Sequence, residues 1–183
     1  MNISLRNKLV KNKHLALNKM KYKTTPCQKP NCQCCGQISD KEHFKINGKT
    51  IRPAAGCCTT YNIIYCVQCN ICQKNYVGRS VQRLNERIGQ HRRSFYEILG
   101  NSSALTNDIY TKDDNYSLGI HLVKDHNMSK KSDFTNNYTV FLLETCSPVI
   151  LEVQEHKFIQ SLRSIRPHGL NSVDPFGIPL LRF

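Results

Sequence analysis

The sequence of 183 residues has no tryptophan and few acidic side chains, with 13 Asp and Glu against 26 Lys and Arg. It also lacks an apolar run of about 18 residues, the length that a membrane-spanning helix requires. The basic N-terminus is not followed by the apolar stretch of a secretory signal. We therefore expect an intracellular protein, nuclear if eukaryotic, that has no membrane partner. A net charge of +13 favours a polyanionic ligand.

The positive charge is concentrated in two places. Seven basic residues and no acidic ones precede Thr24, and they are Arg6, Lys8, Lys11, Lys13, Lys19, Lys21 and Lys23. A second cluster contains Arg87 and four candidate DNA-binding residues, which are Arg79, Arg83, Arg92 and Arg93. Such clustering is typical of nucleic-acid-binding surfaces. The alternative is a solvated basic face with Lys and Asn raised by codon bias.

The ten cysteines favour zinc over disulfides, because they occur without a secretory signal and include Cys-x-x-Cys spacing in a basic chain. Cys69 and Cys72 have the spacing of a zinc knuckle, which brings two sulfurs to one metal. His121 and His126 are the candidate partners for a closed, structural site. They are five residues apart, so we expect the helix that carries them to loosen near Asp125.

A second zinc site is predicted upstream, in a segment with too few aliphatic residues to be stable without a cross-link such as a bound metal. Its candidate ligands are Cys27, Cys32, Cys35 and Cys58. Cys34 is adjacent to Cys35, and Cys57 is adjacent to Cys58. The sequence does not determine which cysteine of each pair binds the metal. Cys66 and Cys146 are expected to be buried thiols. A disulfide-rich extracellular protein is the competing interpretation of the ten cysteines.

Hydrophobic patterning predicts the element order β-β-α-α-β-α. Strands are expected at 61–67, 75–78 and 138–145, and helices at about 80–99, 116–126 and 148–164, the first of them capped by Ser80. The fold class is therefore α/β of the α+β type, with a small three-stranded antiparallel sheet flanked by helices. Alternation along the strands places Tyr65 and Tyr76 on one face, with Ile64 and Val77 on the other.

Several positions in this order resemble the GIY-YIG endonuclease family. The first signature is Ile63-Ile64-Tyr65, where isoleucine stands in place of the usual glycine, and the second is Tyr76-Val77-Gly78. Further matches are Arg87, His91, Glu155 and Asn171. Cys69 and Cys72 between the two signatures, with His121 and His126, look like the nuclease domain of Penelope-like retroelements, in which these positions bind zinc. The upstream string PCQKPNCQCC is also similar to that group.

The resemblance covers about 61–176 and implies a domain division. We expect a basic arm at 1–24, a Cys-rich zinc-binding segment at 25–60, a nuclease domain at 61–176 and a tail at 177–183. Double-stranded DNA is the expected partner, and RNA or a reverse transcriptase is a further one if the chain is part of a larger element. The sequence does not settle the target site, the oligomeric state or whether one strand or both are cut.

The resemblance also implies a role for each polar position. Glu155 would hold the catalytic Mg²⁺ or Mn²⁺ ion, with Glu152 as the competing ligand. Tyr65 or Tyr76 would orient or deprotonate water, and Arg87 would stabilise the transition state. His91 would contact a phosphate oxygen or protonate the leaving group, and Asn171 would buttress the site. The competing structural roles are core aromatics, a surface glutamate, and a histidine and an asparagine whose hydrogen bonds are only structural.

These observations support two hypotheses about function. The first is a metal-dependent DNA endonuclease that nicks or cuts target DNA, consistent with retroelement insertion. The second is a non-catalytic, zinc-containing nucleic-acid-binding module that has kept the shape and lost the reaction. Binding alone requires only charge, so the polar residues Tyr65, Tyr76, Arg87 and Glu155 favour the first.

Overall fold

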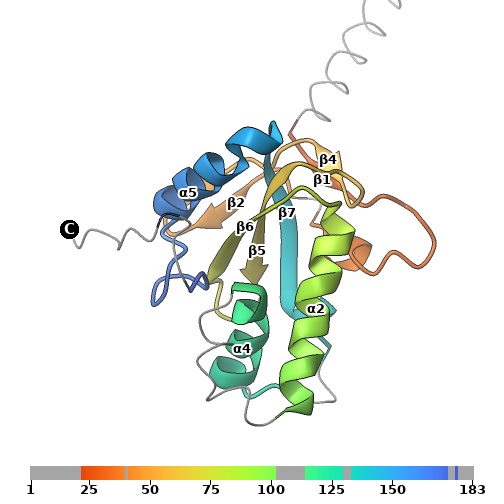
Figure 1. Cartoon of the computed structure of the whole chain (residues 1–183), viewed down its shortest axis with the longest axis vertical. Coiled ribbons are helices and arrows are strands. Elements are labelled where there is room, and N and C mark those ends of the chain that lie inside the picture. Colours follow the sequence, from red (N-terminus) through yellow and green to blue (C-terminus); the bar gives the residue numbers. More distant parts are fainter. Residues whose placement is uncertain (1–21, 40, 102–113, 130–132, 173–175, 177–183) are drawn as a thin grey trace, which may run out of the picture.

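A computed structural model describes residues 22–39, 41–101, 114–129, 133–172 and 176 (Figure 1). The expected tail at 177–183 lies outside the described residues, as does the expected basic arm apart from 22–24. In the described part of the chain, no helix has both the length and the apolarity needed to cross a membrane.

The centre of the molecule is a three-stranded antiparallel sheet of β5 (Ile63–Cys69), β6 (Asn75–Ser80) and β7 (Tyr138–Thr145). The strand order is β6-β5-β7, so β5 lies in the middle and all of its residues are buried. This arrangement confirms the predicted mixed α/β class and the three-stranded antiparallel sheet. Side chains of β5 face helices on both sides, which explains its nearly continuous apolar sequence.

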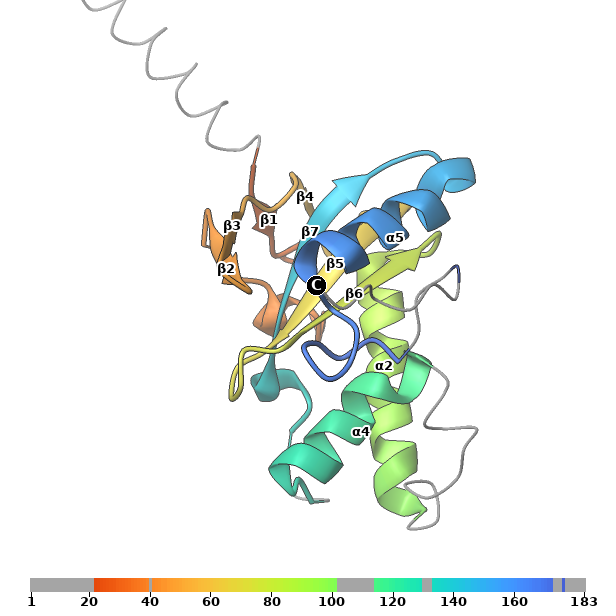
Figure 2. The same ribbon diagram turned by 90° about the vertical axis from the view of Figure 1, so that its left-hand side faces the viewer.

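Helices cover both faces of the sheet (Figure 2). Helices α2 (Leu84–Gly100) and α4 (Asp114–His126) pack on the face that carries Tyr65, Val67 and Tyr76. Helix α5 (Leu151–Leu162) packs on the opposite face, against Ile64, Cys66 and Val77. The predicted alternation of tyrosines and aliphatic residues is therefore confirmed. Both tyrosines face the same pair of helices.

Helix α2 begins at Leu84, later than the predicted cap at Ser80. Ser80 still belongs to β6, because it pairs with Ile63, and its hydroxyl accepts the backbone N–H of Gln82. Glu86 closes the start of the helix by accepting the backbone N–H of Arg83. The buried stripe contains Leu84, Ile88, His91, Phe95 and Ile98. Leu99 is only half-buried, and His91 is the one polar residue of the stripe.

The N-terminal segment contains short strands that pack on the central sheet. Strand β1 (Thr24–Thr25) pairs with β4 (Gly56–Cys57), and the Thr24 hydroxyl accepts the Leu142 backbone N–H from β7. Strands β2 (Phe44–Ile46) and β3 (Lys49–Ile51) form a hairpin that our sequence prediction lacks. Its turn is Asn47-Gly48, with φ of 46° and 79°. Asn-Gly between two strands is the strongest short-range hairpin signal, so the sequence did contain it.

The remaining elements follow the prediction with small shifts. Strand β7 has the expected bounds, whereas α4 begins at Asp114 and α5 is preceded by a 3₁₀ turn, η4 (Pro148–Ile150). A second 3₁₀ turn, η1 (Cys35–Gln37), lies in the Cys-rich segment, and a third, η3 (Thr135–Asn137), precedes β7. Helices α2 and α4 cross closely at Gly119, where a Cβ would lie 2.7 Å from Ile98 Cδ1. This close crossing fixes the position of α4 against α2.

Candidate functional site

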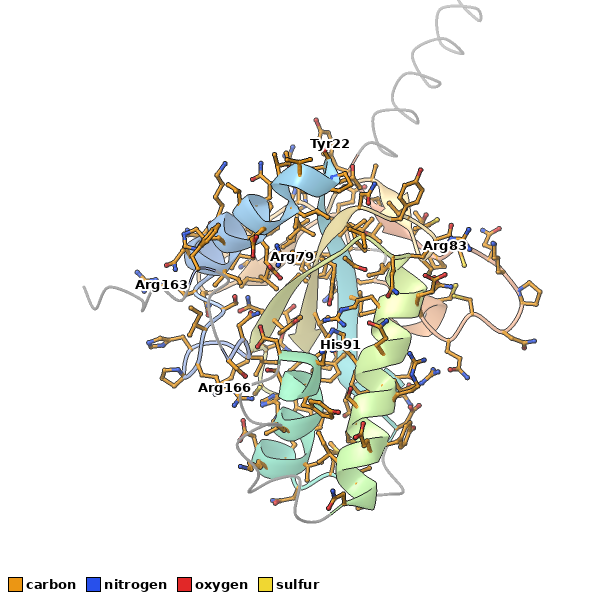
Figure 3. All side chains as sticks on the ribbon, viewed as in Figure 1. Tyr22, Arg79, Arg83, His91, Arg163 and Arg166 are labelled. Carbon is orange, nitrogen blue, oxygen red and sulfur yellow. The ribbon has the colours of Figure 1, made fainter. Side chains whose placement is uncertain are left out.

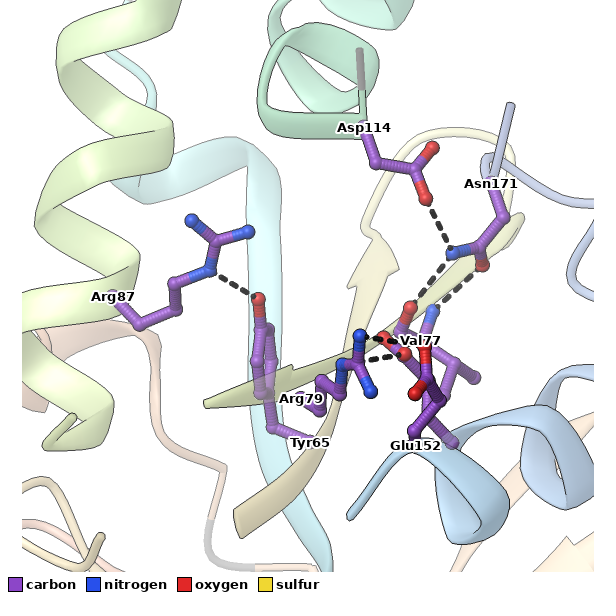
Figure 4. A network of polar contacts seen from close by, with 8 residues as sticks. Tyr65, Val77, Arg79, Arg87, Asp114, Glu152 and Asn171 are labelled. Carbon is purple, nitrogen blue, oxygen red and sulfur yellow. Dashed lines mark hydrogen bonds and ion pairs between the residues drawn. The ribbon is translucent and has the colours of Figure 1, made fainter. Parts of the chain in front are cut away.

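Tyr65 from β5 lies at the centre of a polar cluster built with α2. Its hydroxyl oxygen lies 2.8 Å from His91 Nε2 and accepts the Nε–H of Arg87 at 3.1 Å. Arg87 also donates to Gln90 Oε1 at 2.8 Å and to Asn115 Oδ1 at 2.6 Å. Figure 4 shows the guanidinium directed at the phenol. Arg87 and His91 are one turn apart on α2, so the sequence spacing and the strand register together bring them to the same phenol.

His91 is fully buried and both of its ring nitrogens have partners. Nδ1 lies 3.2 Å from the Asn115 backbone carbonyl, which can only accept, so Nδ1 carries the proton. Nε2 is then an acceptor for the Tyr65 hydroxyl. Burial and the Arg87 charge lower the pKa of His91 to about 3, which keeps the ring neutral. These contacts make His91 the orienting partner of Tyr65, and its expected role at a phosphate oxygen or leaving group stays a prediction.

Both tyrosines are part of the core, with Tyr65 0% and Tyr76 2% exposed. Their rings lie 6.2 Å apart between centroids, and the Tyr76 ring meets the His91 ring edge to face. Burial raises the pKa of both phenols, but the Arg87 charge and hydrogen bond oppose this rise at Tyr65. At Tyr76 the next causes, Tyr65 and Asp114, raise the pKa further. Tyr65 is therefore the easier of the two phenols to ionise.

Gly78 leaves room for both phenols, which explains a glycine at this position of β6. A Cβ on Gly78 would lie 2.5 Å from the Tyr65 hydroxyl and 2.7 Å from Tyr76 Cε1. We expect Gly78→Ala to cost about 1–3 kcal/mol of stability through overpacking and to displace the Tyr65 hydroxyl. Thermal unfolding and one-dimensional NMR of the Tyr65–His91 hydrogen bond would measure both effects. Gly100→Ala is the control, because nothing lies within 4 Å of its Cβ position.

Glu155 from α5 approaches the cluster from the other side of β6. Its carboxylate lies 3.2 Å from Arg79 Nε, while Glu152 lies 3.0 Å from Arg79 Nη2. Glu155 is 8% exposed, and burial raises its pKa to about 7 against the opposing charge of Arg79. Its charge raises the pKa of both tyrosines, and the Arg87 charge acts on it in turn. Glu152 is more exposed, and Glu155 is the carboxylate whose charge acts on the two phenols.

Asn171 connects the loop after α5 to strand β6. Its side chain accepts the backbone N–H of Val77 at 2.9 Å and donates to the Val77 carbonyl at 2.7 Å. It also donates to Asp114, whose carboxylate accepts the Ser172 backbone N–H at 2.7 Å (Figure 4). The predicted buttressing contacts are therefore present, and Asn171 acts on the backbone of β6.

Asp114 and Asn115, at the start of α4, were not predicted as site residues. Burial raises the pKa of Asp114, and its charge in turn raises the pKa of Glu155. Asn115 holds Arg87 and His91, as described above. No local signal marks either residue, because 101–115 reads as a polar loop in the sequence. The position of α4 against α2 gives them their partners.

The first predicted zinc set comes together as four ligand atoms within 4.8 Å of one another. Cys72 Sγ lies 3.3 Å from His121 Nε2, and Cys69 Sγ lies 3.5 Å from His126 Nε2. These separations fit a tetrahedral zinc ion with Zn–S of about 2.3 Å and Zn–N of about 2.0 Å. An Asp125 carboxylate oxygen lies 2.7 Å from His121 Nδ1 and orients the ring. At many zinc sites a carboxylate holds a histidine ligand in the same way.

The expected loosening of the helix near Asp125 does not occur. Helix α4 stays regular to His126, its last residue, and the chain turns at Asn127 with a φ of 52°. The histidines reach one point because Nε2 of each ring extends toward Cys69 and Cys72, so the two Nε2 atoms lie 3.1 Å apart. Side-chain length, not a break in the backbone, compensates for the spacing of five.

The second predicted set, Cys27, Cys32, Cys35 and Cys58, also gathers within 4.8 Å. Cys35 Sγ lies 3.6 Å from both Cys27 Sγ and Cys58 Sγ, close to the sulfur separation of about 3.8 Å that a tetrahedral zinc thiolate site requires. Both sets could hold a metal ion such as zinc. The sequence left open whether Cys34 or Cys35, and whether Cys57 or Cys58, belongs to this set. The structure places Cys35 and Cys58 in it. All ten cysteines are free thiols in the structure.

Both clusters contact the elements that carry the polar site. The Cys58 carbonyl accepts the backbone N–H of Asn85 in the first turn of α2, at 2.8 Å. His121 and His126 lie on α4, whose Asn115 holds Arg87 and His91. The position of each helix against the sheet is therefore connected to one cysteine cluster. Metal binding at either cluster would stabilise the geometry around Tyr65.

The predicted DNA-binding arginines do not form one surface. Arg79 lies beside the polar cluster, whereas Arg83 lies at the start of α2 (Figure 3). Arg92 lies beside Cys32 and Gln33 of the Cys-rich segment instead. Arg93 is exposed on the outer side of α2. Residues five or more apart on a helix need not share a face, which is why sequence clustering overestimated this patch.

Comparisons with known proteins add no assignment. Family models, curated proteins and solved structures were all searched, and no match to this chain was found in any of the three. The chemical capacity of the chain therefore has to be inferred from its own contacts. These contacts provide a guanidinium, a phenol with an oriented acceptor, and a buried carboxylate around one segment of β6.

Proposed function

We propose that this chain is a metal-dependent endonuclease that hydrolyses phosphodiester bonds in DNA. We infer a GIY-YIG type of site, related to the nuclease domain of Penelope-like retroelements. One observation supports this proposal above the others. Arg87, Tyr65 and Glu155 come from three different elements and interact electrostatically at the same segment of β6, where they perturb one another's pKa values. A structural core has no need of two charged groups there.

Arg87 is the proposed phosphate ligand. Its hydrogen-bond acceptors are the neutral oxygens of Tyr65, Gln90 and Asn115. No carboxylate lies within ion-pair distance of it among the described residues. A mostly buried guanidinium with neutral partners attracts an anion, and its planar fork suits two phosphate oxygens. Arg87 would thus stabilise the charge that develops on phosphorus.

Tyr65 is the proposed base for the attacking water. Its hydroxyl donates a hydrogen bond to the neutral His91 Nε2, and Arg87 would stabilise the phenolate form that accepts a proton from water. His91 is held by the Asn115 carbonyl, so the orientation of the phenol is defined by one hydrogen-bond acceptor. The proposal therefore chooses Tyr65 over Tyr76, because the Arg87 charge and hydrogen bond oppose the rise in the pKa of Tyr65, whereas the next causes at Tyr76 raise its pKa further.

Glu155 suits Mg²⁺ or Mn²⁺, because a hard carboxylate oxygen is the donor that these ions prefer. When bound, the ion would supply charge neutralisation at the phosphate. Arg79 can keep its ion pair with Glu152 while Glu155 serves the metal, since it contacts both carboxylates. A pKa of about 7 means that Glu155 is available as an anion at and above neutral pH.

Nicking of a supercoiled plasmid is the experiment that tests this function. The chain should convert supercoiled DNA to the relaxed form with Mg²⁺ or Mn²⁺ and should not do so with EDTA. The non-catalytic binding module is the alternative, and two observations favour it: the phenols are buried, and Glu155 is already paired with Arg79. DNA binding without metal-dependent nicking would support that alternative.

Arg87→Lys should reduce nicking by about a hundred-fold. A lysine cannot donate to Tyr65, Gln90 and Asn115 while also donating two parallel hydrogen bonds to a phosphate. The loss corresponds to about 3 kcal/mol of transition-state stabilisation. Initial nicking rates at saturating Mg²⁺ would measure it. Arg92→Lys is the matched control on the other flank of α2, and an equal loss in that variant would contradict the assignment.

A further inference from the structure

A groove of about 330 Å³ adjoins the polar cluster, between the end of β6, the first turns of α2 and the start of α5. Arg87 provides positive charge, Arg79 lies beside it in ion pairs with Glu152 and Glu155, and Val81, Pro148 and Leu151 provide an apolar wall. Pockets that bind small molecules begin at about 300 Å³, so this groove has room for one group of nucleotide size. It is open to solvent, and it extends the site beyond the atoms that would react.

Two glutamines form the polar part of the groove. Arg87 donates to Gln90 Oε1 at 2.8 Å, and Gln90 Nε2 donates to Gln82 Oε1 at 2.7 Å. This chain of contacts orients the Gln82 amide relative to the guanidinium. A glutamine amide offers both a donor and an acceptor, which matches the edge of a nucleobase. The first N–H groups of α2 are not free for an anion, because Leu84 and Asn85 donate to Thr60 and Cys58 carbonyls.

Exposed apolar side chains lie in this groove and next to it in the chain. Val81, which lines the groove, is 61% exposed, and Val149 and Ile150 of η4, which follow Pro148, are 88% and 41% exposed. A guanidinium beside an apolar wall suits a ligand with an anionic end and a flat apolar face. A nucleotide has both, whereas a free phosphate or an acidic peptide lacks the apolar face. In duplex DNA the faces of the bases are covered by stacking, so only an unstacked base can contact such a wall.

We propose that this groove binds one unstacked nucleotide next to the scissile phosphate. Its phosphate would lie on Arg87, its face on Val81 and its edge on the Gln82 amide. The inference rests on the proposed function and deepens it. The chain would cut where one base is already unpaired or easily extruded, such as a nick, a flap or a mismatch, in preference to uniform duplex.

The test uses the full chain and a synthetic duplex whose cut position has been mapped by sequencing of nicked products. 2-Aminopurine is placed at each position flanking the cut, and its fluorescence is recorded as Glu155→Gln protein is added. An unstacked base should fluoresce strongly at one flanking position only. Adding Val81→Ser to the Glu155→Gln protein should reduce that signal. The single variant Val81→Ser should raise KM by about five-fold, because it removes apolar contact area.

The matched control is Val153→Ser, an exposed valine of α5 that does not line the groove. It should leave the fluorescence and KM unchanged. Fluorescence that stays quenched at every flanking position, while the wild-type chain still nicks DNA, would overturn the inference and leave the proposed function intact. A wild-type chain that never nicks DNA would overturn both. An equal effect of Val153→Ser would also overturn the inference.

Discussion

Glu155→Gln is expected to abolish nicking, by at least about a thousand-fold, while DNA binding stays within about two-fold of the wild type. Glutamine keeps the size of the side chain and its ability to hydrogen-bond but removes the negative charge that would hold Mg²⁺. Binding depends mainly on the basic residues, which the substitution leaves in place. Plasmid nicking and gel-shift titration on the same preparations would measure the two properties.

The same substitution should stabilise the protein at alkaline pH. The pKa of Glu155 is raised from 4.5 to about 7 in the folded state, because burial disfavours the ionised carboxylate. Stability from the protonated carboxyl is therefore complete below pH 4.5 and is lost as the pH rises through 7. At pH 8 the glutamine variant should be more stable than the wild type by about 3 kcal/mol, and near pH 4.5 the difference should vanish. Urea unfolding at the two pH values would measure this.

Glu152→Gln is the matched control, since Glu152 also pairs with Arg79 but its side chain is 47% exposed. It should lose less than about ten-fold in nicking, because an ion pair between exposed side chains contributes little. Mg²⁺ should raise the melting temperature of the wild type and of Glu152→Gln, but not that of Glu155→Gln. Normal nicking by Glu155→Gln in Mg²⁺ would show that the site has been assigned to the wrong carboxylate.

Removal of zinc should unfold the site, and Mg²⁺ alone should not restore it. Structural zinc contributes on the order of 10 kcal/mol or more in small zinc-binding peptides, which exceeds the stability of many domains. Chelation should therefore abolish cooperative unfolding and nicking together. Zinc followed by Mg²⁺ should recover both. Circular dichroism, plasmid nicking and metal content by mass spectrometry would be recorded on the same samples.

Two zinc ions per chain are expected in the purified protein. His121→Ala should lose one ion and loosen α4, and Cys27→Ser should lose the other. Cys146→Ser is the control, because Cys146 lies in neither cluster and should leave both ions bound. Ten reactive thiols after denaturation with a chelator would exclude the disulfide interpretation. Protein that folds cooperatively and nicks DNA without any zinc would contradict a structural role for these clusters.

The sequence by itself determined the order and type of the main elements. Alternation in β5 and β6 placed both tyrosines on one face, and the spacing of Cys69 and Cys72, together with the family resemblance that adds His121 and His126, indicated one ligand set. These signals are local, because they depend on the repeat of a strand or on the reach of a short turn. These signals still hold in the folded protein, because the side chains that pack in the core follow the same strand periodicity. The Asn47-Gly48 turn was equally local and was overlooked.

Tertiary structure decided which side chains meet. It buried His91 against Tyr65, brought Asp114 and Asn115 to the site, and chose Cys35 and Cys58 over their neighbours. Adjacent residues point in different directions, so a choice between them depends on which element packs on each side. The sequence supplied the chemical groups of this protein. Their distances and pKa values arose only when α2, α4 and α5 closed on the sheet, because burial and through-space charge are properties of packed neighbours.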